Sequence, residues 1–249
     1  MKATVYSIDG KALKQIDLPE VFESPQREDL VKRAVLSEET RKYQPQGSYI
    51  YAGLETSARY RGRKEDYGAV KNKGIPHLPH EVQPNGQFGK VKRIPGSVKG
   101  RRAHPPKVQK KIVELMNKKE MSKALATALS FTANRNSVCA RMNEDIGVSL
   151  PIVMEDKFEK MTKTKDVEKV LEALNLKKLL ARSKKNGTKS LLIVVSNSAS
   201  VKGGANLPGV DVVRADGLSV KDLAPGTHPG RLTLYSESAL PEIAKRFEK

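Results

Sequence analysis

The sequence predicts an α/β protein with a mostly parallel sheet flanked by helices and a long extended basic loop inserted near the N-terminal third. In the last third of the chain, β-rich runs alternate with apolar residues at helical spacing, the pattern of parallel strands joined by crossover helices. Residues 59–107 break this pattern with seven glycines and six prolines, so no helix or strand of normal length fits there. We expect a single α/β globular domain over residues 1–249, with residues 43–107 as an extended basic loop within it.

The N-terminal third begins with a hairpin and a helix. Residues 3–8 and 13–18 are strand-like, and Asp9-Gly10 between them is a favoured hairpin turn. Residues 27–41 are helix-like because apolar residues gather on one side of the helical projection. The chain turns polar at Tyr43, where the predicted loop starts.

The C-terminal side of the loop carries a further helix signal. Pro105-Pro106 stand where a helix can begin, and Val108, Ile112 and Leu115 follow at i, i+4 and i+7. This spacing predicts an amphipathic helix directly after the prolines. The elements predicted beyond it are helices over 122–132 (with Ser122 as N-cap), 167–174 and a final one capped by Ser236 or Ser238, and strands over 151–154, 190–196, 210–213 and 232–235.

Positive charge is concentrated in the loop. The chain has a formal net charge of +18, and residues 59–107 contribute thirteen cations against three acids. Such a segment buries too little apolar surface to offset its ordering entropy, whereas a polyanion can order it. We therefore predict RNA contact for its cations and for three residues that can stack or hydrogen-bond: Arg59, Tyr60, Arg61, Arg63, Lys64, Tyr67, Lys71, Lys73, Lys90, Lys92, Arg93, Lys99, Arg101, Arg102, His104 and Lys107.

Aromatic residues reinforce this interpretation. Five of the seven tyrosines fall between Tyr43 and Tyr67, interleaved with arginines, and phenol and guanidinium planes stack on unpaired bases. Tyr60 and Tyr67 have no apolar neighbours in the sequence and are the better candidates for RNA contact. For Tyr49 and Tyr51, a place in a strand or core at the root of the loop remains an equal alternative.

Other residue patterns carry little chemistry. His77 and His80 have metal-like spacing, but they lie in a cationic loop without cysteine ligands. Lys202-Gly203-Gly204-Ala205 matches no phosphate-binding loop, and the lone Cys139 has no histidine assigned to it. We expect no catalytic residue, no metal and no cofactor.

Localisation follows from the same negative observations. The N-terminal ten residues are polar and lack the apolar core of a signal peptide. The longest apolar run, 191–195, is strand-sized rather than membrane-spanning. We expect a cytoplasmic protein with no membrane partner.

Segments spread over nearly the whole chain resemble the archaeal and eukaryotic branch of the universal large-subunit ribosomal protein L-four family. The more specific ones run through His104-Pro105-Pro106 and through Pro229-Gly230-Arg231. The resembling segments are Ala3-Thr4-Val5-Tyr6 with Asp9-Gly10, Asp17-Leu18-Pro19 to Val21-Phe22, Arg27-Glu28-Asp29-Leu30, Tyr51-Ala52-Gly53-Leu54, 98–107, 222–226 and 229–233.

The resemblance implies a structural role on the ribosome. It implies an α/β body at the ribosome surface and a long loop threaded into 23S-type rRNA, whose tip helps line the nascent-peptide exit tunnel. The implied partners are this rRNA, neighbouring large-subunit proteins and the nascent peptide. Two departures stand out: the acids Glu65-Asp66 and the His-Pro stretch at 77–80 replace a glycine-rich basic run, and the basic stretch 182–189 is short.

Two other functions remain as alternatives. One is a free RNA-binding regulator of the protein's own message, and the other is a nucleotide-dependent α/β enzyme with a basic lid. The regulator does not stay with the large subunit at moderate salt, and the enzyme shows a nucleotide-dependent melting shift.

The composition of the loop predicts that residues 59–107 are disordered in the protein free of RNA. Limited trypsin digestion of the free chain is expected to cut first within this segment and to leave the flanking parts associated. First cuts between residues 160 and 249 would place the mobile element elsewhere.

Overall fold

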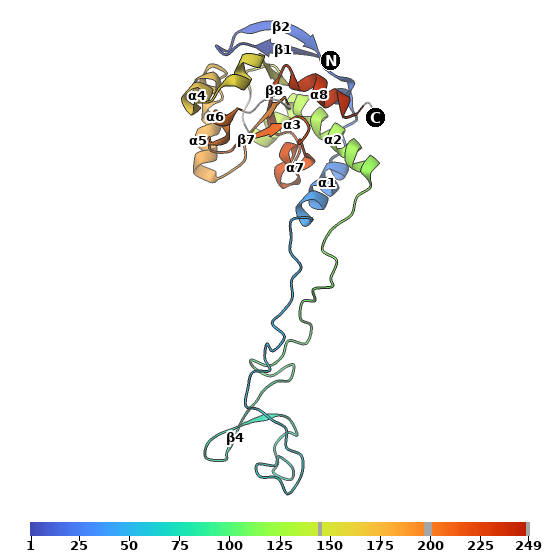
Figure 1. Cartoon of the computed structure of the whole chain (residues 1–249), viewed down its shortest axis with the longest axis vertical. Helices are drawn as coiled ribbons and strands as arrows, with labels where there is room; N and C mark the ends of the chain where they lie inside the picture. Colours follow the sequence, from blue (N-terminus) through green and yellow to red (C-terminus); the bar gives the residue numbers. More distant parts are fainter. Residues whose placement is uncertain (144–145, 197–200, 248–249) are drawn as a thin grey trace. The chain divides into compact units, whose positions relative to one another are not determined.

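The computed structural model describes residues 1–143, 146–196 and 201–247, and the chain divides into two compact units (Figure 1). Residues 1–42 with 113–249 form one unit, called here the body, and residues 43–112 form the other, called the basic unit. That the two units make a single domain stays a prediction.

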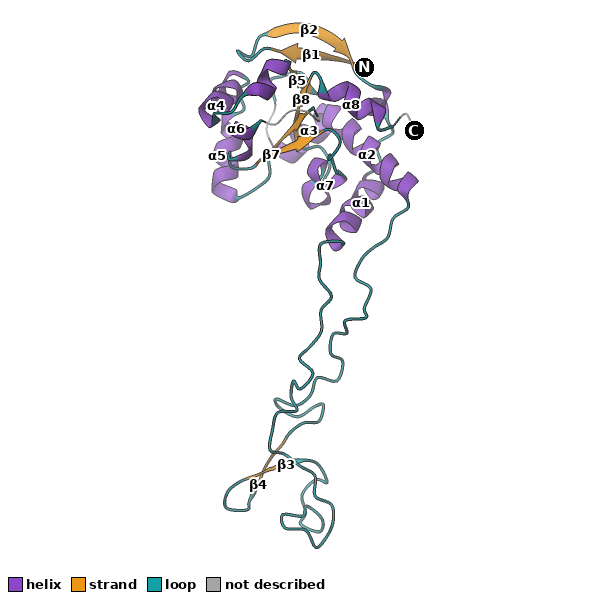
Figure 2. Cartoon of the chain, viewed as in Figure 1, coloured by secondary structure: helices purple, strands orange, loops and turns teal. Residues whose placement is uncertain are grey.

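A six-stranded sheet of the described residues runs through the body (Figure 2). Its order is β2-β1-β5-β8-β6-β7, and every neighbouring pair is parallel except the hairpin β1–β2. The mostly parallel α/β fold predicted from the sequence is therefore confirmed. The strands are β1 (Lys2–Tyr6), β2 (Ala12–Asp17), β5 (Ile152–Met154), β6 (Leu191–Val195), β7 (Val210–Arg214) and β8 (Leu232–Ser236).

Strand β6 shows why the sheet forms. Its five residues are Leu-Leu-Ile-Val-Val, all of them buried, as expected for a parallel strand covered by helices on both faces. It pairs in register with both neighbours, Leu191 lying opposite Leu232 of β8 and Val210 of β7. At the other end of the sheet, the edge strand β2 is mostly exposed and carries Lys14, Gln15 and Asp17, and charged residues on an edge strand disfavour pairing with other chains.

Helices cover both faces of the sheet and enclose two apolar clusters. The first cluster takes its helical members from α1, α2, α7 and α8, and the second from α3, α4, α5 and the α6 region. The helices are α1 (Glu28–Thr40), α2 (Lys118–Ala133), α3 (Arg135–Met142), α4 (Thr164–Ala173), α5 (Lys177–Asn186), α6 (Lys202–Ala205), α7 (Val220–Leu223) and α8 (Ala239–Lys245), with short 3-10 turns at Glu20–Glu23, Asp156–Lys160 and Pro225–Thr227.

The prediction of a helix directly after Pro105-Pro106 is wrong. Residues 105–117, all of them described, contain no helix, and α2 starts only at Lys118, with Asn117 rather than Ser122 as its N-cap. Val108, Ile112 and Leu115 do have helical spacing, but Leu115 is 85% exposed and does not pack against an apolar surface. Since most helical stability in proteins comes from packing an apolar face, spacing alone did not suffice.

Helix α5 was not predicted from the sequence. Five of its ten residues are cations, which hid the apolar face on which Leu179 is buried. Gly187 ends the helix in a left-handed conformation, φ 64°, and its N–H donates to the Ser183 carbonyl. The short basic stretch at 182–189 is thus the end of a helix and the turn that follows it.

A fully buried arginine joins three neighbouring strands at the ends where they begin. Arg231 precedes β8, and its Nη2 donates to the Leu191 carbonyl of β6 at 2.6 Å and pairs with Asp211 of β7 at 2.7 Å, while Nη1 donates to the Asp222 carbonyl at 2.9 Å. Burial lowers the pKa of the Arg231 guanidinium. Burial also acts to raise the pKa of the Asp211 carboxyl, but hydrogen bonds from Lys189 and Arg231 outweigh it and lower that pKa.

A second arginine holds the segment that leads to Arg231. Arg141 of α3 donates to the carbonyls of Pro225, at 2.9 Å, and of His228. Burial, together with the nearby Arg231 charge, lowers the pKa of Arg141 to about 10. A Cβ at Gly230 would lie 2.7 Å from the Ser137 carbonyl oxygen, and its φ is +86°, so the backbone there requires glycine. Gly230 and Arg231 of the Pro229-Gly230-Arg231 motif are therefore buried parts of the body, and Pro229 is half-buried.

Replacing Asp211 with Asn is expected to lower the free energy of unfolding by about 1–3 kcal/mol, because it leaves the buried Arg231 cation without its anion. Since the folded-state pKa of Asp211 is lowered, this contribution is present above about pH 4 and is lost as the pH falls through the folded-state value. Urea unfolding of the full chain at pH 7 and pH 3 measures it. Lys189→Met removes the exposed partner of the same carboxylate and is the control, with an expected cost below about 1 kcal/mol. Equal losses in the two variants would contradict this role of the buried pair.

Candidate RNA-binding surface

The basic unit is built around a short hairpin and a very small core. Strands β3 (His80–Val82) and β4 (Phe88–Val91) pair antiparallel, and Arg59 bridges to His80. The residues of this unit that are buried are Ala58, Ala69, Val70 and His80. Within residues 43–112, all described, strands of three and four residues are the regular elements, in agreement with the prediction that no normal helix or strand fits.

His80 is a structural residue of this core. Its Nδ1 lies 3.0 Å from the Gly89 carbonyl oxygen and its Nε2 lies 3.0 Å from that of Pro76, while its ring contacts Phe88 edge-on at 5.9 Å. Both ring nitrogens are therefore engaged by backbone oxygens, whereas a metal needs a free lone pair. His77 is exposed. Among the described residues, no group of three or more His, Cys, Asp or Glu side chains could hold a metal ion.

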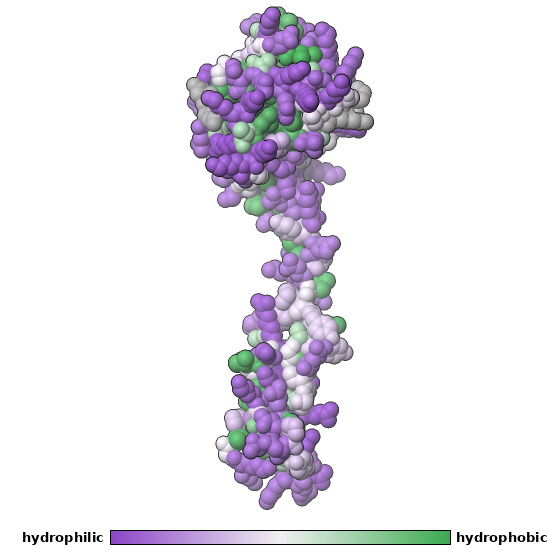
Figure 3. Space-filling model, turned by 90° about the vertical axis from the view of Figure 1, so that its left-hand side faces the viewer, coloured by the Kyte–Doolittle hydropathy of each residue, from purple (hydrophilic) through white to green (hydrophobic). Residues whose placement is uncertain are grey.

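Most of the cations predicted to contact RNA are exposed. Acids neutralise little of their charge, because the pair that Arg63 makes with Glu65, at 3.5 Å, is itself solvent-exposed. Figure 3 shows a mostly hydrophilic surface on this unit. The exposed cations of the predicted set are Arg59, Arg63, Lys64, Lys71, Lys73, Lys90, Lys99, Arg101, Arg102 and Lys107.

The other three cations of the set are half-buried and donate inside the unit. Arg61 Nη1 donates to the Tyr67 carbonyl at 2.6 Å, Arg93 Nη1 to that of Ala58 at 3.2 Å, and Lys92 Nζ to that of Val98 at 3.3 Å. These bonds hold together a segment that has almost no apolar core. The contact of these three residues with RNA stays a prediction.

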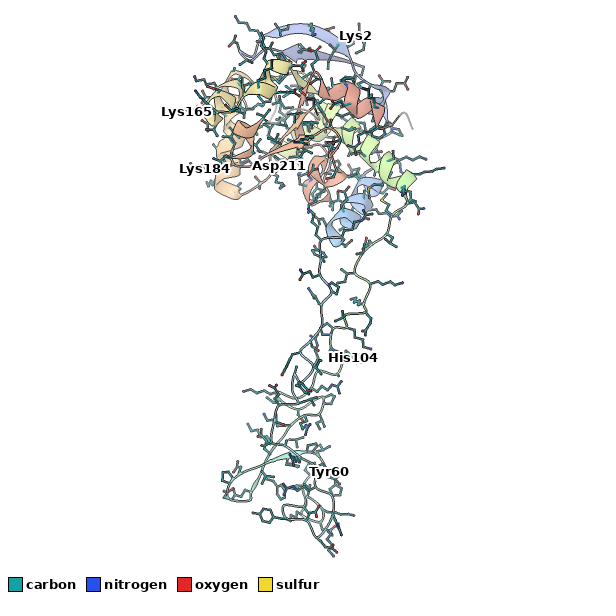
Figure 4. The ribbon with its side chains drawn as sticks, in the orientation of Figure 1. Lys2, Tyr60, His104, Lys165, Lys184 and Asp211 are labelled. Atoms are coloured by element: carbon teal, nitrogen blue, oxygen red, sulfur yellow. The ribbon has the colours of Figure 1, made fainter. Side chains whose placement is uncertain are left out.

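The aromatic members of the set are exposed as well. Tyr60 and Tyr67 are 50% and 78% exposed, and His104 is exposed too; Figure 4 labels Tyr60 and His104. Lys73 lies over the Phe88 ring, 5.1 Å from its centroid. Tyrosine and histidine rings are thus available beside the cations, the combination that holds unpaired RNA bases and their phosphates.

Sequence reasoning left Tyr49 and Tyr51 open as strand or core residues, and that alternative is wrong. Neither lies in a strand, and their exposed fractions are 61% and 57%. The signal that could have indicated exposure is local: residues 41–50 are mainly polar, charged or turn-forming, so no apolar face can form around them.

Two glycines bring the two halves of the loop together. Gly53 has φ +75°, and a Cβ there would lie 2.5 Å from the Gly100 carbonyl carbon and oxygen; a Cβ on Gly100 would lie 2.2 Å from the Ile94 carbonyl oxygen. Only glycine permits this approach. It places the turn at 49–54 directly against the cationic run 99–102.

The glycines after β6 serve packing instead of phosphate binding. A Cβ on Gly204 in α6 would lie 3.1 Å from Val212 Cγ2 and 3.2 Å from Ile193 Cδ1, so glycine lets α6 lie close to the sheet. The segment Lys202–Ala205, which matches no phosphate-binding loop, is a four-residue helix. Residues 197–200, which connect β6 to it, lie outside the described residues.

Comparison of the sequence with known proteins shows the family of the chain. The family model of the "Ribosomal protein L4/L1 family" matches residues 16–246. The chain belongs to this family. It is 42% identical to the large ribosomal subunit protein uL4 of Methanocaldococcus jannaschii over 266 aligned residues that cover all of both chains. It is 38% identical to that of Haloquadratum walsbyi, over 99% of this chain and all of the relative.

These matches confirm the resemblance and distinguish a ribosomal protein from a nucleotide-dependent enzyme. Membership of a ribosomal protein family confirms the prediction that the chain is not an enzyme, and the nucleotide-dependent alternative is dropped. Within the described residues no helix is both long and apolar enough to cross a membrane.

Proposed function

We propose that this protein is a structural component of the large ribosomal subunit in the cytoplasm, and that it binds the subunit's rRNA through the basic unit. Family membership supports the ribosomal role. The observation that carries the RNA proposal is the ten exposed and almost unneutralised cations between Arg59 and Lys107. Charge at that density on a backbone with little core is suited to phosphates in a folded RNA.

Each class of residue has its own role in this proposal. Exposed arginines and lysines neutralise phosphates, glycines allow close backbone approach, and Tyr60, Tyr67 and His104 stack or hydrogen-bond with bases. Arg61, Lys92 and Arg93 hold the chain in the shape that presents the others. Neighbouring large-subunit proteins are further proposed partners.

The family resemblance also supports a division of labour within the basic unit. Between Gly74 and Gly89 the chain carries one acid, Glu81, and neither lysine nor arginine, whereas the run 90–107 carries seven cations. A weakly charged wall does not hold a passing peptide, and charged flanks suit phosphates. We propose that the segment 74–89 helps line the nascent-peptide exit tunnel and contacts the nascent peptide.

Replacing both Arg101 and Arg102 with Ala is expected to weaken binding to purified large-subunit rRNA and to flatten the dependence of log K on log salt by about one to two units, since each phosphate contact contributes roughly 0.7–0.9. Filter binding from low to moderate salt measures the slope. The matched control removes two exposed lysines from α4 of the body, Lys165 and Lys169, and leaves the slope unchanged. Equal slopes in wild type and the arginine variant would mean that these arginines do not meet phosphates.

The tunnel proposal predicts separable defects. The double variant Gln83→Lys, Gln87→Lys adds positive charge at an exposed turn. The backbone bond of this turn, from the Gln83 N–H to the Gln87 carbonyl at 3.0 Å, is kept, so the variant is expected to enter subunits normally. The added charge is expected to alter ribosome stalling. Replacing Lys99, Arg101 and Arg102 with Gln is expected to impair entry itself. Subunit occupancy by quantitative mass spectrometry, in cells that also express wild type, and ribosome profiling measure the two effects. The reverse result, with the turn variant excluded and the charge variant assembled, would contradict the proposal.

A regulator of the protein's own message is the second candidate. The same exposed cations would serve it, and co-sedimentation distinguishes the two. A structural component stays with the large subunit at moderate salt, whereas a regulator is found mostly in the unbound fraction.

A further inference from the structure

We propose that Tyr49 and Tyr51 form a stacking platform for an unpaired RNA base, beside the phosphate-binding run at Lys99, Arg101 and Arg102. This proposal rests on the proposed rRNA binding and adds to it a site of a different chemistry. Neither tyrosine belongs to the set of contacts predicted from the sequence.

The two rings form an exposed pair. Their centroids are 5.8 Å apart with an interplanar angle of 68°, an edge-to-face arrangement that covers one ring face at most. The exposed fractions, 61% for Tyr49 and 57% for Tyr51, agree with this, and Ile50 between them is 82% exposed. Ring faces therefore remain open to a flat partner.

Local bonds within residues 49–55 fix the arrangement of the two rings. The Tyr49 hydroxyl donates to Glu55 Oε1 at 2.6 Å. The backbone makes two successive turns, from the Ala52 N–H to the Tyr49 carbonyl at 3.0 Å and from the Leu54 N–H to the Tyr51 carbonyl at 2.8 Å. A rigid ring loses little entropy when a base stacks on it, which favours binding.

The charge next to the platform indicates which partner fits. Because Gly53 contacts the Gly100–Arg101 backbone, the tyrosine turn lies against Lys99, Arg101 and Arg102, all three exposed. In single-stranded nucleic acid each base is joined to phosphates, so a ring face next to cations matches both parts of a nucleotide. Apolar protein interfaces are depleted of charge at their centre, so a protein surface is the weaker match.

Four variants test the platform by filter binding to purified large-subunit rRNA across a salt series. Tyr51→Leu and Tyr49→Leu keep apolar bulk but remove the aromatic face, and each is expected to weaken binding roughly 5- to 150-fold, the range for loss of one stacked base. The slope of log K against log salt is expected to stay unchanged, because no phosphate contact is removed. Tyr51→Phe keeps the ring and is expected to bind within about twofold of wild type, whereas Tyr49→Phe also loses the bond to Glu55 and is expected to weaken binding less than Tyr49→Leu does.

A second measurement reports stacking directly. The chain contains no tryptophan, so Tyr51→Trp introduces a single indole at the platform. Its fluorescence is expected to be quenched by the rRNA and to be little changed by heparin, a polyanion without bases. Equal responses to both would show a charge effect and overturn the proposal.

The outcomes separate this proposal from the one on which it rests. Wild-type binding with the expected salt slope, together with unchanged affinity in both Leu variants, would refute the platform and leave the proposed rRNA binding intact. Leu variants that bind rRNA normally but lose a large-subunit protein in a pull-down from dissociated subunits would assign the platform to protein docking, again against this proposal. Absence of salt-dependent binding in wild type would refute both.

Discussion

Charge concentrated in one segment is the constraint on which the rest of this structure depends. Residues 59–107 carry thirteen cations, seven glycines and six prolines, so the apolar core that they can form is very small. Apolar burial is left to the body, where two clusters pack against the faces of a mostly parallel sheet. The body therefore contains the apolar burial that stabilises the fold, and the basic unit exposes most of its residues to solvent.

The two units use arginine in opposite ways. In the body, Arg231 is fully buried. Its two terminal nitrogens make an ion pair and bonds to two carbonyls that join β6, β7, β8 and α7, while its Nε has no hydrogen-bond partner among the described residues. Burying this charge is tolerated because anion and acceptors lie within hydrogen-bond distance. In the basic unit, Arg101 and Arg102 are exposed, and their charge is directed outward. Arg61 and Arg93 are intermediate, since backbone carbonyls of a loosely packed segment accept from them.

The proposed RNA binding uses an extended surface instead of a pocket. The Gly53–Gly100 approach shows how that surface is organised without a core: two residues without side chains allow backbones to touch, and the turn at 49–54 is held against the run 99–102. In the proposed complex, electrostatic attraction comes from the run 99–102 and stacking from the adjacent turn at 49–54. The first falls with salt and the second does not.

The sequence by itself determined the α/β class, the strands β6, β7 and β8, and the basic character of residues 59–107. These depend on local composition: short runs rich in β-branched and other apolar residues form strands, and most residues of a densely charged segment stay exposed. Only the tertiary structure decided that 105–117 is not helical, that the cation-rich 177–186 is, and that Arg231 and Asp211 meet. It also decided that His80 is a core residue and that Tyr49 and Tyr51 are exposed beside Arg101.

Each of these outcomes depends on what a residue packs against, and the residues in contact can be far apart in the chain. Gly53 and Gly100, for example, are separated by 47 positions. Local spacing reports the preference of a segment, whereas burial and hydrogen-bond partners depend on contacts between distant segments.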